Sequence, residues 1–180
     1  PNGTLALTDK RTGEIYSDLL TFEDRSEIGD GWFHGESVND APALSSATGA
    51  QVRVLHDGPE IVTFRIEVTL AVPKRYNWHA EAPVEETVPL RIRSDVSLRR
   101  GARVVDVATT IDNVAEDHRL QLLLPSDAAD AQTYVAHTAF DLVTRPIALD
   151  TATSDWQEAE IVEKPFESMQ AVGQGSRGLA

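Results

Sequence analysis

The chain has 180 residues, no cysteine and a formal net charge of −13 at pH 7. The absence of cysteine excludes disulfides and thiolate metal sites, and an acidic surface repels phosphate backbones, so no nucleic-acid partner is expected. No apolar run approaches the roughly 18 residues of a membrane span, so no membrane partner is expected either. We expect a reducing, cytoplasmic setting. The first residues, PNGTLALTDK, lack an initiator Met and a signal-peptide pattern, so we expect a chain cut from a longer one.

Alternating apolar and polar residues predict a series of strands along the chain. Turn-forming residues and prolines separate these strands, and Gly13 in the first turn suits a positive φ. The tail, residues 173–180, is poor in apolar residues and is expected to fray. In chain order the predicted strands span residues 4–8, 14–17, 51–55, 61–72, 87–98, 105–111, 120–124, 134–143 and 156–162.

Residues 103–125, RVVDVATTIDNVAEDHRLQLLLP, form the predicted centre of the fold. Two alternating segments flank the polar stretch 113–117, and Pro125 ends the second segment because it cannot donate to a strand ladder. This pattern predicts a β-hairpin. A lone hairpin is marginally stable in water, so the remaining strands are expected to cover its apolar face.

Long strands with tight turns and no amphipathic helix predict an all-β fold. We expect an antiparallel β-sandwich that spans residues 1–180 as a single domain, with one long functional loop.

That loop lies between residues 25 and 48, and its centre is GDGWFHGESVND, residues 29–40. Long irregular loops in compact domains are uncommon and often functional. Trp32 and Phe33 could plug the end of a sandwich or stack on the apolar face of a sugar; the residues alone favour the plug. Trp78 and His79 carry the same two interpretations.

No local catalytic motif is present: the sequence has no nucleophile elbow, phosphate loop, zinc-protease helix motif or dinucleotide fingerprint. His118 beside Asp117 is interpreted as a loop residue rather than a base. Oxygen and nitrogen ligands are dense between residues 24 and 40, but their spacing does not match the twelve-residue calcium loop, which favours a solvated acidic loop over a metal site. They are Asp24, Glu27, Asp30, His34 and Asp40.

Four segments, taken together and in order, resemble the C-terminal β-sandwich region of glycoside hydrolase family 38, the α-mannosidases, and the bacterial branch in particular. The order and natural spacing of these segments cover nearly the whole chain. They are NGTLALTDKRTGEIY (2–16), FEDRSEIGDGWFHGESVND (22–40), VVDVATTIDNVAEDHRLQLLLP (104–125) and AFDLVTRPI (139–147).

The resemblance implies a piece of a multidomain, zinc-dependent hydrolase of α-mannosides. Its barrel would hold the zinc ion and the Asp nucleophile, and a helical bundle would follow the barrel. Nothing in this chain matches the barrel or the bundle, so no catalytic and no metal-binding residue is assigned here, and the chain alone is expected to be inactive. Its expected partners are the barrel and helical domains of the same polypeptide, and a mannoside or oligosaccharide substrate.

In that family a loop of the β region offers an aromatic side chain to the active site, and residues 29–35, GDGWFHG, match this loop. The resemblance therefore implies substrate-side contacts from Asp30, Trp32 and His34. Many relatives carry Tyr where this chain has Trp32, and an indole N–H only donates, which leaves the sugar specificity open. Two alternatives also remain: a free-standing carbohydrate-binding module with exposed aromatic rings, and a purely structural or interaction domain with Trp32 and Trp78 buried.

Overall fold

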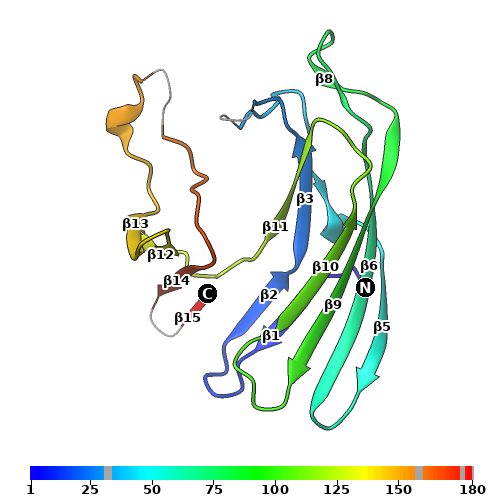
Figure 1. Ribbon diagram of the computed structural model, residues 1–180, viewed down its shortest axis with the longest axis vertical. Coiled ribbons are helices and arrows are strands. Elements are labelled where there is room, and N and C mark those ends of the chain that lie inside the picture. Colours follow the sequence, from blue (N-terminus) through cyan, green and yellow to red (C-terminus); the bar gives the residue numbers. More distant parts are fainter. Residues whose placement is uncertain (31–33, 157–159, 175–176, 180) are drawn as a thin grey trace. The chain divides into compact units, whose positions relative to one another are not determined.

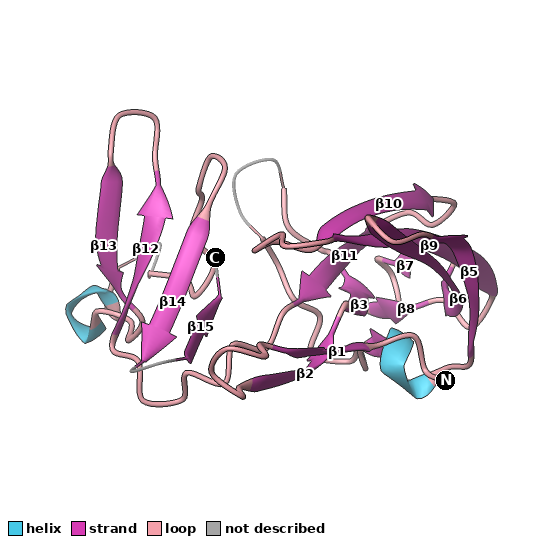
Figure 2. Ribbon diagram, turned by 90° about the horizontal axis from the view of Figure 1, so that it is seen from below, coloured by secondary structure: helices cyan, strands magenta, loops and turns pink. Residues whose placement is uncertain are grey.

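The structure is a computed structural model that describes residues 1–30, 34–156, 160–174 and 177–179. Its contacts divide the chain into two compact units. Unit 1 comprises residues 1–6 and 17–124, and unit 2 comprises residues 7–16 and 125–180. Strands are the main regular elements of the ribbon, and loops connect them (Figures 1 and 2). The helical elements of the described residues are two single 3₁₀ turns.

Unit 1 is organised around a four-stranded antiparallel sheet with the order β10-β9-β6-β5. Its two central strands have thirteen residues each and pair along their whole length, from Ile61 opposite Arg99 to Pro73 opposite Thr87. The long alternating apolar pattern of both strands agrees with this length, because it places apolar side chains on one face along the ladder. The strands are β5 (Ala50–Asp57), β6 (Ile61–Pro73), β9 (Thr87–Arg99) and β10 (Asp106–Asp112).

The second sheet of unit 1 is shorter and has the order β11-β3-β4. It comprises β3 (Thr21–Ser26), β4 (Ala43–Leu44) and β11 (His118–Leu123). The 3₁₀ turn η1 (Ser45–Ala47) follows β4, and the buried Ser45 Oγ accepts a hydrogen bond of 2.8 Å from the Phe22 N–H. Apolar residues of both sheets form one hydrophobic core, which confirms the predicted antiparallel β-sandwich.

The predicted hairpin over residues 103–125 is wrong, although both of its strands exist. β10 pairs with β9, whereas β11 pairs with β3, so the chain crosses from one sheet to the other through residues 113–117. Figure 2 shows β10 and β11 within their separate sheets. Alternation identifies the buried face of a strand but not its neighbour, and sandwich connections often pass between sheets.

The core of unit 1 gathers on the inner face of the long sheet. Leu70, Val72 and Leu90 are almost completely inaccessible to solvent, and Leu20 and Phe22 of the N-terminal segment pack against the same cluster. The sequence alternation at residues 66–72 and 88–92 therefore identifies the buried face correctly.

The shorter sheet leaves part of this inner face uncovered. Thirteen residues of extended chain span about 44 Å, whereas the six residues of β3 or β11 span about 20 Å. Val54, Phe64 and Val107 lie in one paired row with Val96, and they remain 53%, 42% and 43% exposed. We call these three residues, together with Leu98 (49% exposed), the uncovered end.

Two small hairpins accompany the sheets. β1 (Leu5–Thr8) pairs with β2 (Ile15–Leu19), and the turn between them places Gly13 at φ +78°, as the sequence predicts. β7 (Tyr76–Asn77) pairs with β8 (Ala82–Pro83) in the connection from β6 to β9.

Unit 2 carries a four-stranded sheet with the order β13-β12-β14-β15. The strand expected over residues 134–143 is two strands, because residues 138–141 turn the chain back: the Thr138 N–H donates to the Asp141 carbonyl over 2.9 Å. The tail expected to fray instead contributes paired strands. The elements are β12 (Thr133–His137), β13 (Leu142–Pro146), η2 (Thr151–Thr153), β14 (Gln170–Gln174) and β15 (Arg177–Leu179).

Three further expectations concern a predicted strand, membrane crossing and the number of domains. Of the predicted strand 156–162, the described residues 156 and 160–162 adopt no strand. Within the described ranges, no helix has the length and apolar character that a membrane crossing requires. The single domain over residues 1–180 stays a prediction.

Candidate functional site

Three connections of unit 1 are joined by hydrogen bonds at one end of the sandwich: residues 27–40, 74–86 and 113–118. The Glu27 N–H donates to the Asp117 carbonyl over 2.9 Å, and the Glu116 N–H donates to the Lys74 carbonyl over 2.9 Å. The Asn39 side-chain amide donates to the Glu81 carbonyl over 3.2 Å. We call these three connections the loop cluster.

The first loop closes on itself immediately after β3. Glu27 and Glu36 form an antiparallel bridge, and the Ile28 N–H donates to the Gly35 carbonyl over 2.9 Å. A Cβ atom at Gly35 would lie 2.8 Å from the Gly29 backbone nitrogen. Only glycine therefore allows the two sides of this loop to approach so closely.

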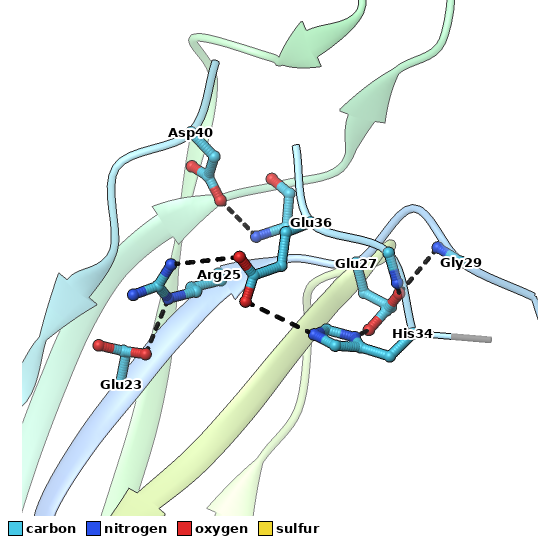
Figure 3. A network of polar contacts seen from close by, with 9 residues as sticks. Glu23, Arg25, Glu27, Gly29, His34, Glu36 and Asp40 are labelled. Atoms are coloured by element: carbon cyan, nitrogen blue, oxygen red, sulfur yellow. Dashed lines mark hydrogen bonds and ion pairs between the residues drawn. The ribbon is translucent and has the colours of Figure 1, made fainter. Parts of the chain in front are cut away.

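The Glu27 carboxylate is the centre of the loop (Figure 3). One of its oxygens accepts hydrogen bonds of 2.7 Å from the N–H groups of Gly29 and Gly35. Its other oxygen contacts the Nδ1 atom of His34. A carboxylate with this many partners fixes the backbone around it, so Glu27 holds the loop rather than serving as an available acid or base.

Opposing effects act on the pKa of the Glu27 carboxyl. Partial burial favours the neutral form and raises the pKa, while the N–H groups of Gly35 and Gly29 and the His34 ring favour the carboxylate. The donors outweigh the burial, so the pKa of Glu27 lies below its ordinary value.

Longer contacts connect this centre to β3 (Figure 3). Glu36 lies 3.8 Å from His34 Nε2 and 3.9 Å from the Arg25 guanidinium, which also forms a 2.8 Å ion pair with Glu23. Asp40 accepts a hydrogen bond of 2.5 Å from the Ser26 N–H at the far end of the loop. The loop is thus tied to β3 by charged and polar groups rather than by apolar packing.

His118 opens β11 and lies between two partners. Its Nδ1 atom is 2.5 Å from the buried Asp24 carboxylate, and its Nε2 atom is 2.8 Å from the Asn113 side-chain oxygen. Both ring nitrogens are engaged within the fold, which agrees with a structural role for this histidine. Asp117, its neighbour in sequence, instead accepts a 3.2 Å hydrogen bond from the Tyr76 N–H.

The cavity beside these residues is too small for a sugar. It measures about 10 Å³, roughly the space of one water molecule, and is lined by Asp24, Asp40 and His118 among others. A wider recess of about 430 Å³ lies on the outer face of the long sheet, where Glu67 and Asp112 balance Arg91 and Arg93. The described residues that line this recess include no aromatic ring.

The β7–β8 hairpin brings two aromatic rings to the loop cluster. Tyr76 is buried, and its ring contacts that of Trp78 edge-to-face, with centroids 5.1 Å apart and an interplanar angle of 74°. Trp78 itself is 59% exposed within this chain and is not part of its hydrophobic core. The Tyr76 hydroxyl lies 3.3 Å from the Ser37 Oγ of the first loop.

The predicted site residues lie partly within the described structure. His34 is half-buried against Glu27, and Asp30 is exposed on the same loop. Trp32 and Phe33 lie outside the described residues. Within the described ranges, no three His, Asp or Glu side chains are placed to hold a metal ion; Asp24, Glu27 and Asp40 contact His118, His34 and backbone N–H groups instead.

Sequence reasoning missed the residues that organise the loop. The sequence indicates Glu27 only as one of several acids in a solvated loop, and it gives no role to Gly35. The spacing of Gly29 and Gly35 on either side of the short segment DGWFH is a signal that could have revealed a tightly closed loop. No local pattern indicates the Asp24–His118 contact, because the two residues are 94 positions apart in sequence.

Comparison with known proteins finds longer proteins that this chain matches over most of its own length. No protein-family model matches it. A protein of Halalkalibacterium halodurans named "Putative mannosylglycerate hydrolase" is 27% identical over 99% of this chain, which corresponds to 21% of that protein. The chain thus spans about a fifth of the length of this relative.

Two solved structures from Enterococcus faecalis share the fold. An α-mannosidase from strain V583 superposes with a TM-score of 0.89 at 23% identity, over 98% of this chain and 21% of that one. A protein in glycosyl hydrolase family 38 gives a TM-score of 0.76 at 27% identity, over 81% of this chain and 19% of that one. The resemblance to glycoside hydrolase family 38 that the sequence motifs predict is therefore confirmed.

Proposed function

We propose that this chain is a non-catalytic β-sandwich part of a zinc-dependent glycoside hydrolase that cleaves terminal α-mannosides. The observation that carries the proposal is the match of nearly the whole chain to about a fifth of longer glycosidases. Family resemblance further implies retention of anomeric configuration through a glycosyl-enzyme intermediate. The name of the Halalkalibacterium halodurans relative adds mannosylglycerate as a candidate substrate.

In this proposal the loop 29–40 contributes to the rim of the active site, and Asp30, Trp32 and His34 contact the substrate. The support is the way in which the loop is held. Glu27 accepts hydrogen bonds from the backbone N–H groups of Gly29 and Gly35, and its carboxylate also contacts His34. A pre-organised loop on a rigid sheet is a common way to position binding residues.

The same proposal gives unit 1 a partner within its own polypeptide. The barrel and helical domains of the longer enzyme would pack on this chain, and the uncovered end supplies apolar surface for such a contact. By the family resemblance, the zinc ion would be held by the barrel of the longer enzyme, outside this chain.

Kinetics of the full-length enzyme test the role of the loop. An aryl α-mannoside and mannosylglycerate are assayed with the wild type, Trp32→Ala and His34→Ala, with a thermal melt of each protein. We expect each substitution to lower kcat/KM about tenfold or more, equivalent to about 1.4 kcal/mol of transition-state stabilisation, and we expect Trp32→Ala to leave the melting temperature unchanged.

Trp156→Ala is the matched control, because Trp156 is a 66% exposed indole outside the loop cluster. Unchanged kinetics with a lowered melting temperature for Trp32→Ala would make Trp32 a core residue and refute the contact. Absence of activity on both mannosides would refute the proposed enzyme class. The 180-residue chain alone is expected to show no hydrolysis, and measurable turnover by it would refute its non-catalytic role.

A further inference from the structure

We infer that Trp78, on the β7–β8 hairpin, is a binding site for a pyranose ring. The inference rests on the proposed function, since it gives the loop cluster a second sugar-facing element beside the loop 29–40. It assigns a role to a residue that sequence reasoning left undecided between core and ligand contact.

The indole is exposed and makes one contact with another aromatic ring. Trp78 is 59% exposed, while its ring contact with the buried Tyr76 restrains the side chain from one side. An edge-to-face pair is favourable by about 0.5–1.5 kcal/mol beyond the area that it buries. A restrained ring loses less conformational entropy on binding than a mobile one, which favours ligand stacking.

The backbone beneath the indole is equally constrained. The hairpin pairs Tyr76 with Pro83 and Asn77 with Ala82. The Asn77 side-chain oxygen accepts hydrogen bonds from the N–H groups of His79 and Ala80, at 3.1 and 3.2 Å. The turn that carries Trp78 is therefore closed by its own polar groups.

Two contacts place this hairpin beside the candidate substrate loop. The Tyr76 hydroxyl lies 3.3 Å from Ser37 Oγ, and the Asn39 amide donates to the Glu81 carbonyl. Trp78 thus belongs to the same end of unit 1 as His34.

The surroundings of the ring favour a sugar over an apolar protein segment. A pyranose has an apolar face of C–H groups and a rim of hydroxyls, so its site combines one aromatic face with hydrogen-bonding side chains. Asn77, His79 and Glu81 flank Trp78 along the hairpin and are exposed polar residues. By contrast, Trp156 has no aromatic ring partner among the described residues.

Direct binding to the 180-residue chain tests the inference. Methyl α-mannoside and an α-linked mannobiose are titrated while the indole N–H resonances are followed by NMR. We expect saturable shifts of the Trp78 resonance at sugar concentrations of about 1–50 mM, with the Trp156 resonance unchanged. Trp78→Ala should weaken binding about tenfold or more, Trp78→Phe should weaken it less, and Trp156→Ala should not weaken it.

A Trp78 resonance that does not move over this range would overturn the inference, as would equal weakening by Trp78→Ala and Trp156→Ala. Trp78→Ala removes the ring contact with Tyr76, so its melting temperature should fall slightly, and a thermal scan verifies that each variant remains folded. The readout is binding rather than hydrolysis. If the sugar titration shows no binding at Trp78, the kinetic test of the full-length enzyme still decides the proposed function. If the full-length enzyme cleaves no mannoside, the titration still decides whether Trp78 binds a sugar.

Discussion

The β6–β9 ladder and the loop cluster lie within the same unit but depend on different interactions. Thirteen paired positions and an apolar inner face hold the ladder, and its core side chains are inaccessible to solvent. The loop cluster instead depends on a few charged and polar contacts, centred on Glu27, His118 and Tyr76. We therefore expect that substitutions of single polar residues in the loop cluster leave the sandwich of unit 1 folded.

The largest expected effect lies in the ladder. Leu90→Ala should lower the free energy of unfolding by about 3 kcal/mol, because it removes a side chain with no solvent exposure and leaves a cavity. Denaturant unfolding measures this loss. Leu98→Ala is the matched control in the same strand at the uncovered end, and it should cost less than about 1 kcal/mol. If both variants lost the same free energy of unfolding, Leu98 would be as well packed as Leu90, and the hydrophobic core would extend into the uncovered end.

The Asp24–His118 contact should give the next largest effect. Asp24→Ala removes a buried carboxylate that contacts the His118 ring, and a charge-assisted hydrogen bond of this kind contributes about 1.5–3 kcal/mol. The free energies of unfolding of Asp24→Ala, His118→Ala and the double variant form a thermodynamic cycle. Additive losses within about 0.5 kcal/mol would show that the two side chains do not interact.

The patterns that predict the ladder and the loop cluster differ in physical origin. Alternation at Val68, Leu70 and Val72 reflects burial of one face, so the strand and its core side can be deduced from the sequence. Neither the pairing of β10 with β9 nor the contact of Asp24 with His118 leaves a local pattern, because both depend on chain segments brought together by the fold.

Glu27 should make the loop sensitive to acid. Its pKa is lower in the folded protein than its ordinary value of 4.5, so its stabilising contribution is complete above that value and disappears as pH falls through the folded pKa. We expect protection of the Gly35 amide against hydrogen exchange, relative to the intrinsic rate, to decrease below about pH 4.5. Glu27→Gln should reduce this protection at neutral pH as well. Equal protection of both proteins at pH 7 would show that the carboxylate does not hold the loop.

The smallest expected effect concerns the hydroxyl that joins the hairpin to the first loop. Tyr76→Phe keeps the ring against Trp78 but removes the group near Ser37 Oγ, which should cost about 0.5–1 kcal/mol. Ser37→Ala should have a similar effect, and the double variant should cost no more than either one. Thermal melts of the three variants measure this, and a fully additive double variant would exclude the contact.

The passage of the chain from β10 to β11 has a consequence for the order of folding. β5, β6, β9 and β10 are sheet neighbours in chain order, interrupted only by the β7–β8 hairpin among the described strands, so each pairing closes a modest loop. β3, in contrast, pairs with a strand that follows more than ninety positions later, as the 94-residue separation of Asp24 and His118 indicates. Closing the larger loop costs more chain entropy and slows folding. During synthesis, β3 must therefore leave the ribosome long before its partner β11 exists, and Phe22 must wait for burial until the long sheet has formed.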